Sequence, residues 1–417
     1  MRLFLIIGIL FLMFPALGQE ELDDDRKVET RKNIARAMTE PVYRRLNSIH
    51  EMLAEERYSD AMSALSKMDN MRLNKYEEAL VLQTYGFAHV QQGNYQTALK
   101  YFEFSVAANA LPALAQQGML YSLAGLYAAE GHYLKCIETI REWFRYEEDP
   151  VADAYMIIGS AFTELERYDD ALPYVQKAIQ KAEVPKENWY LLELAIYFEK
   201  KRFHDAIALL KKVVQFWPDK PKYWNMLASS YLELNDDKAA LDTMMIAYTK
   251  DMLTSENRIM ALVQLNMIQN IPYTAGVILE KALAAGTIEE TRKNLDILLQ
   301  AWLSSREYAR AVATIDQLAP FAEDGVYFMR KAGIHNELGE WEMVIVAADQ
   351  ALQMGIERPT EAHMLAGMAY TELKLFPKAI AAFRDAREVG NAKQRNNADA
   401  WIDFVTEKIL IKSAALN

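Results

Sequence analysis

The chain has 417 residues, of which 52% are hydrophobic and 25% charged, a composition typical of folded proteins and not of disordered ones. Only 16 glycines and 12 prolines interrupt it, which favours long helices with short turns over a β-sandwich or barrel. The formal net charge of −12 argues against a broad nucleic-acid-binding surface, and the single cysteine excludes an internal disulfide framework and a cysteine-rich zinc site.

Residues 1–18 have the pattern of a secretory signal peptide. A positively charged start, Met1-Arg2, precedes an uninterrupted apolar run over residues 3–14, and small residues follow at Ala16 and Gly18. The run is shorter than a membrane-spanning helix requires. We therefore expect cleavage after Gly18 and export to the periplasm of a Gram-negative bacterium; the alternative is an uncleaved anchor. Residues 19–41 are expected to form a charged lead-in segment.

From residue 42 to residue 393 one pattern recurs. An apolar helix is followed by a turn, an aromatic residue, a small residue and a second apolar helix, as in Gly93-Asn94-Tyr95-Gln96-Thr97-Ala98. The small residues are separated by 33 to 38 positions, a period close to 34. They are Ala61, Ala98, Cys136, Ala171, Ala206, Ala240, Ala275, Ala311, Val344 and Ala379.

This pattern resembles the tetratricopeptide repeat (TPR), whose two helices meet through small residues and whose neighbouring copies stack into one continuous core. One copy matches closely through Trp224, Leu227, Ala228, Tyr231, Ala240, Met244 and Ala247. Others depart from the family pattern: His89 and His335 replace an aromatic residue, and the copy around Ala275 has Asn266 and Pro272. The resemblance implies an all-α fold: a right-handed α-solenoid of about ten repeats over residues 42–393.

The last segment, residues 394–417, is expected to form a capping helix. Trp401, Phe404, Val405 and Ile409 recur at helical spacing, so they can cover the exposed core of the last repeat.

Sequence patterns for catalysis or metal binding are missing. The six histidines form no zinc-binding pair, and the chain contains no glycine-rich phosphate loop and no nucleophile elbow. We therefore predict a protein that is not an enzyme and that needs neither a cofactor nor a metal.

The resemblance also implies where partners bind, because the first helix of each TPR lines an inner, concave groove. Glutamate recurs there at the thirteenth repeat position, beside methionine and other apolar side chains. One interpretation is that these glutamates are only solvated surface; the other is a groove that binds a segment with basic and hydrophobic residues. The predicted groove residues are Glu164, Phe198, Glu199, Asn225, Glu233, Met260, Met267, Glu337, Met364 and Glu372.

These features predict an exported scaffold or adaptor that binds another envelope protein. Its layout is similar to that of periplasmic TPR proteins associated with TonB-type energy-transduction systems, which implies a TonB component as one partner. The alternative is a module that binds glycan or peptidoglycan in envelope or polysaccharide-export machinery. Neither hypothesis includes nucleic acid or stable membrane insertion after signal cleavage.

Overall fold

The computed structural model of the protein describes residues 28–31 and 37–414. The predicted signal peptide lies outside these residues. Within them every regular element is helical: twenty-one α-helices and one short 3₁₀ turn, η1 (Ala319–Phe321). The predicted all-α fold is confirmed.

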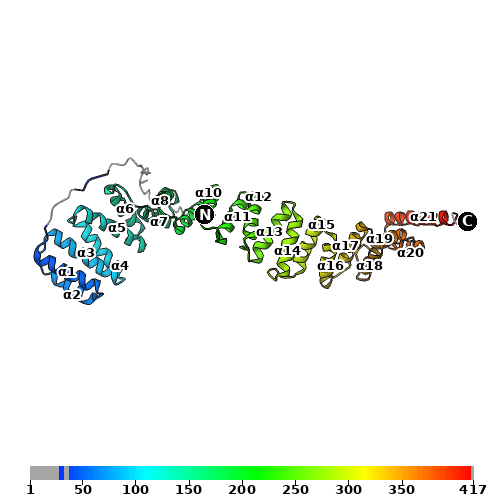
Figure 1. Cartoon of the computed structure of the whole chain (residues 1–417), viewed down its shortest axis with the longest axis horizontal. Helices are drawn as coiled ribbons and strands as arrows, with labels where there is room; N and C mark the ends of the chain where they lie inside the picture. The colour runs from blue at the N-terminus through cyan, green and yellow to red at the C-terminus, as the bar shows by residue number, and fades with distance from the viewer. Residues whose placement is uncertain (1–27, 32–36, 415–417) are drawn as a thin grey trace, which may run out of the picture. The chain divides into compact units, whose positions relative to one another are not determined.

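The first twenty helices form ten antiparallel hairpins, each made of a helix A and the helix B that follows it (Figure 1). The first unit, ending at Pro218, holds five hairpins: α1 (Glu40–Ala54), α2 (Tyr58–Met68), α3 (Lys75–Gln91), α4 (Tyr95–Ala107), α5 (Ala113–Ala129), α6 (Tyr133–Tyr146), α7 (Ala152–Glu164), α8 (Tyr168–Lys181), α9 (Glu187–Glu199) and α10 (Phe203–Phe216).

The second unit, which begins at Asp219, holds the other five hairpins and a final helix. Its helices are α11 (Pro221–Glu233), α12 (Asp237–Thr249), α13 (Glu256–Ile268), α14 (Pro272–Ala284), α15 (Arg292–Ser304), α16 (Tyr308–Leu318), α17 (Val326–Leu338), α18 (Trp341–Gln353), α19 (Pro359–Glu372), α20 (Phe376–Val389) and α21 (Ala392–Ala414).

All ten turns between helix A and helix B share one backbone conformation. The residue five positions before each small residue has φ between 52° and 76°, in the left-handed region. The next residue donates its N–H to the carbonyl five residues earlier, at 2.8–2.9 Å, which is the bond that closes a Schellman motif. Only Gly93, Gly131 and Gly339 are glycines at this position; the others include Glu166 and Lys201.

Small side chains set the spacing inside each hairpin, as the repeat pattern predicts. Ala98, Ala171 and Ala379 are fully buried. On helix A, Gly86 faces Phe102 and Gly367 faces Phe383; a Cβ at either glycine would lie 2.2 or 2.6 Å from the facing ring. A large residue on helix B therefore fits because its partner on helix A has no side chain.

Neighbouring hairpins pack through helix B of one and helix A of the next within each unit. Helices A also contact one another directly in the pairs α1–α3, α5–α7, α7–α9 and α17–α19. Within each unit these contacts place neighbouring helices A on one face, the face where the sequence pattern predicts partner binding.

The least regular copy of the pattern also forms a hairpin, α13–α14. Pro272 is the first residue of α14, where a missing N–H costs nothing. Asn266 is buried, and its side-chain amide donates to the Leu262 carbonyl at 2.9 Å. A polar side chain thus occupies the aromatic position without an unpaired donor.

The final helix α21 packs on α20. Val405 is buried against Ala379 and Phe383, and the Trp401 ring stacks on Phe383 with centroids 5.4 Å apart. The helix expected within residues 394–417 is present and begins slightly earlier, at Ala392.

Candidate functional site

The predicted glutamates occupy equivalent places in five hairpins. Each is exposed and is the last or next-to-last residue of a helix A. We call this set the acidic turn edge: Glu164 on α7, Glu199 on α9, Glu233 on α11, Glu337 on α17 and Glu372 on α19. Residues Glu164 and Glu199 belong to the first unit, and the other three to the second.

Helix stability does not explain these glutamates. The C-terminal end of a helix carries a partial negative charge, so a carboxylate there is mildly destabilising. Glu164 accepts one exposed hydrogen bond, from the Tyr133 hydroxyl at 3.3 Å. Glu233 and Glu372 make no hydrogen bond or ion pair with another described residue. The helix ends and the contacts of these three side chains therefore give no stabilising role to glutamate at this position.

Apolar side chains are exposed at the same turns of the second unit. Leu232 precedes Glu233, Leu338 follows Glu337, and both are exposed, as are Ile268 and Leu375. Four of the five hairpin turns of the second unit thus present an exposed acid, an exposed apolar side chain, or both; the α15–α16 turn presents neither. This combination suits a segment that carries positive charge and a few hydrophobic residues.

The other predicted groove residues are more deeply placed. Met260 and Met267 are half-buried against the core of the second unit, and Met364 packs against the cluster that contains Phe383. Phe198 is half-buried with its ring centroid 6.4 Å from that of Phe203. These side chains are partly core, so less apolar surface is open than the sequence pattern predicts.

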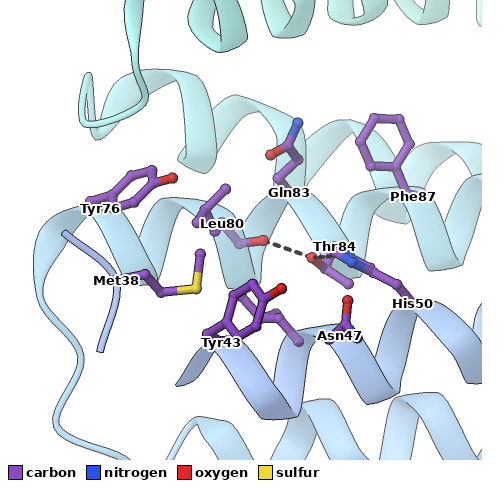
Figure 2. A pocket seen from close by; sticks show the side chains of 10 residues that line it. Met38, Tyr43, Asn47, His50, Tyr76, Leu80, Gln83, Thr84 and Phe87 are labelled. Carbon is purple, nitrogen blue, oxygen red and sulfur yellow. Dashed lines mark hydrogen bonds between the residues drawn. The ribbon is translucent and has the colours of Figure 1, made fainter. Parts of the chain in front are cut away.

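A cavity of about 280 Å³ lies between the first two helices A (Figure 2). Tyr43 and Asn47 reach it from α1, Gln83 and Phe87 from α3, and Met38 from the segment before α1. We call it the front pocket; its complete lining is Met38, Tyr43, Leu46, Asn47, His50, Tyr76, Leu80, Gln83, Thr84 and Phe87.

The front pocket contains aromatic rings and amides but no acidic, lysine or arginine side chain. Tyr43 is 53% exposed and Phe87 41% exposed. The His50 ring nitrogen Nε2 lies 3.3 Å from the Thr84 hydroxyl, and burial lowers the pKa of His50. The histidine is therefore neutral at pH 7, and the lining as a whole is uncharged.

The segment before α1 is fixed at the rim of the front pocket. The Thr39 N–H and hydroxyl donate to one Glu77 oxygen at 2.8 and 2.7 Å, and the Asn74 N–H donates to the other at 2.9 Å. Burial raises the pKa of Glu77, but these hydrogen bonds outweigh it and lower the pKa below its usual value. Glu77 thus stays ionised and positions Met38.

A second cavity of about 480 Å³ lies in the second unit and includes Asn225. Its charged lining residues are of both signs: Asp219 and Asp251 beside Lys250 and Arg258. It therefore has no single charge preference.

The sequence pattern locates part of these sites. Gln83 and Phe87 are at groove positions of the second repeat, but the pocket also needs Tyr43 and Asn47 from the first. The copy around Ala61 matches the pattern weakly, so its groove positions were not assigned. Extending the 37-residue interval between Ala61 and Ala98 back from Gln83 and Phe87 leads to Leu46 and His50, which also line the pocket, but not to Tyr43 or Asn47.

Residues 28–31 and 37–414 hold no group of three histidine, cysteine, aspartate or glutamate side chains placed to bind a metal. None of the described helices is both long and apolar enough to span a membrane. Cys136 is buried, and burial raises its pKa to about 12.

Residues 152–180, which form α7 and most of α8, match the family model described as the tetratricopeptide repeat. No curated protein matches the chain. Similar solved structures include MamA from Desulfovibrio magneticus RS-1, 17% identical with a TM-score of 0.35, over 43% of this chain and 98% of that one. YrrB, described as a TPR protein with an unusual peptide-binding site, is 16% identical with a TM-score of 0.37, over 48% and 96%. Naa15/Naa10 bound to HypK-THB is 11% identical with a TM-score of 0.42, over 84% and 59%.

The hairpin turns, the small-residue contacts and the family match agree. Residues 152–180 match the tetratricopeptide repeat, and the ten hairpins of the described chain share one turn conformation with that segment.

Proposed function

We propose that this chain is an exported, non-catalytic adaptor that binds another protein of the cell envelope through the helix A side of its hairpins. The observation that carries the proposal is the acidic turn edge: glutamates recur at exposed helix ends, where the helix dipole opposes them. The partner segment carries lysine or arginine together with hydrophobic residues, and charge attraction speeds its association.

The narrower proposal is a periplasmic location with a TonB-type component as partner. It rests on the layout of the sequence, an apolar leader followed by a repeat array. The lysine-rich segment implied for such a component would complement the acidic turn edge.

The test is a cross-linked pull-down of the full-length protein from envelope extract at low and high salt. We expect a dominant protein partner that is lost at high salt, because exposed charges are screened. Glu164→Lys, Glu199→Lys and Glu233→Lys together should abolish capture.

A matched control makes the same change in net charge at positions away from the acidic turn edge. Glu138, Asp242 and Glu388 are exposed on helices B, and replacing all three with lysine changes the formal net charge from −12 to −6, as the first set does. The control should still capture the partner. Equal loss in both variants would show that only net charge matters, and would refute the acidic turn edge as the site.

The second candidate function, glycan binding, is favoured by the front pocket. Exposed Tyr43 and Phe87 rings can stack on sugar faces, and the Asn47 and Gln83 amides can pair with hydroxyl groups. Retention of wall fragments that is insensitive to salt and lost in Tyr43→Ala would support this function in place of the adaptor.

A further inference from the structure

The chain carries a short peptide segment docked on its own surface. Residues 28–31, Val-Glu-Thr-Arg, lie against the last turn of α6, more than a hundred residues away in sequence. This place is separate from both the acidic turn edge and the front pocket.

Glu29 is held by backbone and side chain together. Its N–H donates to the Arg145 carbonyl at 2.9 Å. The Arg145 guanidinium returns two hydrogen bonds to one Glu29 oxygen, from Nε at 3.1 Å and from Nη2 at 2.7 Å. The backbone bond fixes the position of the segment along α6, and the ion pair selects an acid at this position.

Arg31, two residues later, is bound by groups of the opposite charge type. Its Nη2 donates to Glu142 at 3.0 Å, and its guanidinium lies 4.0 Å from the centroid of the Tyr146 ring. The Arg31 side chain is only 13% exposed, although that of its partner Glu142 is 47% exposed. The flat guanidinium fits the ring face and the carboxylate at once, which a lysine ammonium does not.

The two ion pairs have opposite polarity. The binding site on the last turn of α6, which we call the seat, therefore distinguishes one order of charges from the other. The seat presents Arg145 to residue 29 and Glu142 to residue 31. A segment with the two charges exchanged would place like charges together at both points. The seat therefore distinguishes acid-x-arginine from arginine-x-acid.

In each of these ion pairs at least one partner is exposed, and such pairs are individually weak and are screened by salt. The segment belongs to the same chain, so its effective concentration at the seat is high without strong affinity. We propose that the last turn of α6 is a binding site for an extended acid-x-arginine segment, and that residues 28–31 are its resident, displaceable occupant. A partner segment of the same chemistry competes with them.

The test uses the full chain and two capped peptides of identical composition, Val-Glu-Thr-Arg and Val-Arg-Thr-Glu. Saturation-transfer NMR on the valine and threonine methyl groups reports binding at about 1 mM peptide, the range in which a short tether competes. The emptied-seat variant carries Glu29→Arg and Arg31→Glu, so its own segment no longer fits. It should bind Val-Glu-Thr-Arg, about tenfold or more strongly than the wild-type chain does, and should ignore the exchanged peptide.

The reversed-seat variant, Glu142→Arg with Arg145→Glu, is the matched control. It should prefer Val-Arg-Thr-Glu, and all four substitutions together should restore the resident segment and exclude both peptides. Circular dichroism checks that each variant keeps its helices. Equal signal from wild-type and emptied-seat chains, no signal from the emptied seat, or a reversed seat without reversed preference would each overturn the proposal. The adaptor function is unaffected by these outcomes, because the acidic turn edge is unchanged in all variants.

Discussion

Gly86 lies in the middle of α3, where alanine is ordinarily the better residue for a helix. We nevertheless expect Gly86→Ala to destabilise the first unit. A Cβ at this position would lie 2.2 Å from Phe102 Cε1 and 2.3 Å from Cδ1. The Phe102 ring is 2% exposed, so it cannot swing into solvent to make room.

The size of the effect follows from the overlap. The shortest contact must lengthen by roughly 1.3 Å to reach a normal carbon–carbon separation. Overpacking a filled core costs about 1–3 kcal/mol, and an overlap this deep belongs at the upper end of that range. The higher helix propensity of alanine relative to glycine offsets about 1 kcal/mol of this cost. The net loss is therefore roughly 1–2 kcal/mol, or about 4 °C in the melting of a unit of this size.

Gly118→Ala is the matched control. Gly118 also lies inside a helix A, α5 of the same unit, and nothing stands within 4 Å of the position its Cβ would take. It should stabilise the unit by about 0.5–1 kcal/mol. Urea and thermal unfolding followed by circular dichroism measure both variants, and Phe102→Leu should rescue Gly86→Ala in a double-mutant cycle. If Gly86→Ala stabilises the protein as much as Gly118→Ala does, the packing argument is refuted.

Three further predictions concern local features. Lys201→Gly should raise the free energy of unfolding of the first unit in urea by about 0.5–1 kcal/mol, because relief of the left-handed strain exceeds the added entropy of the unfolded chain. Gly93→Ala should lower the free energy of unfolding. A change of the same sign and size in both variants would contradict this reasoning. Glu77 has a lowered pKa, so its contribution to stability is present above pH 4.5, the ordinary carboxyl value, and is lost as pH falls through the folded-state pKa; the urea midpoint of wild type should therefore fall more steeply on acidification than that of Glu77→Gln. Cys136 should react with a thiol reagent at pH 8 only after unfolding in urea, and rapid labelling of the native protein would show that the thiol is not buried.

The sequence alone determined the hairpin architecture, because the repeat pattern is local. Each small residue lies five positions after a left-handed turn residue, and both features depend on contacts inside one hairpin. The hairpin forms even where Asn266 and Pro272 depart from the pattern. Asn266 donates to a carbonyl of its own helix, and Pro272 is the first residue of α14.

The places for partners were determined only in part by the sequence. The acidic turn edge could be predicted because its glutamates occupy one repeat position and therefore one end of helix A. The methionines could not be divided into core and surface, because half-burial depends on the neighbouring hairpin.

Tertiary structure alone decided the front pocket and the seat of residues 28–31. The pocket joins side chains of two hairpins, and Arg145 meets Glu29 across 116 positions in sequence. No periodicity relates such residues, since their contact is set by how consecutive hairpins stack and by where residues 28–31 lie on them. Packing inside a hairpin follows from the repeat pattern, whereas contacts between segments that the repeat does not relate are determined only by the tertiary structure.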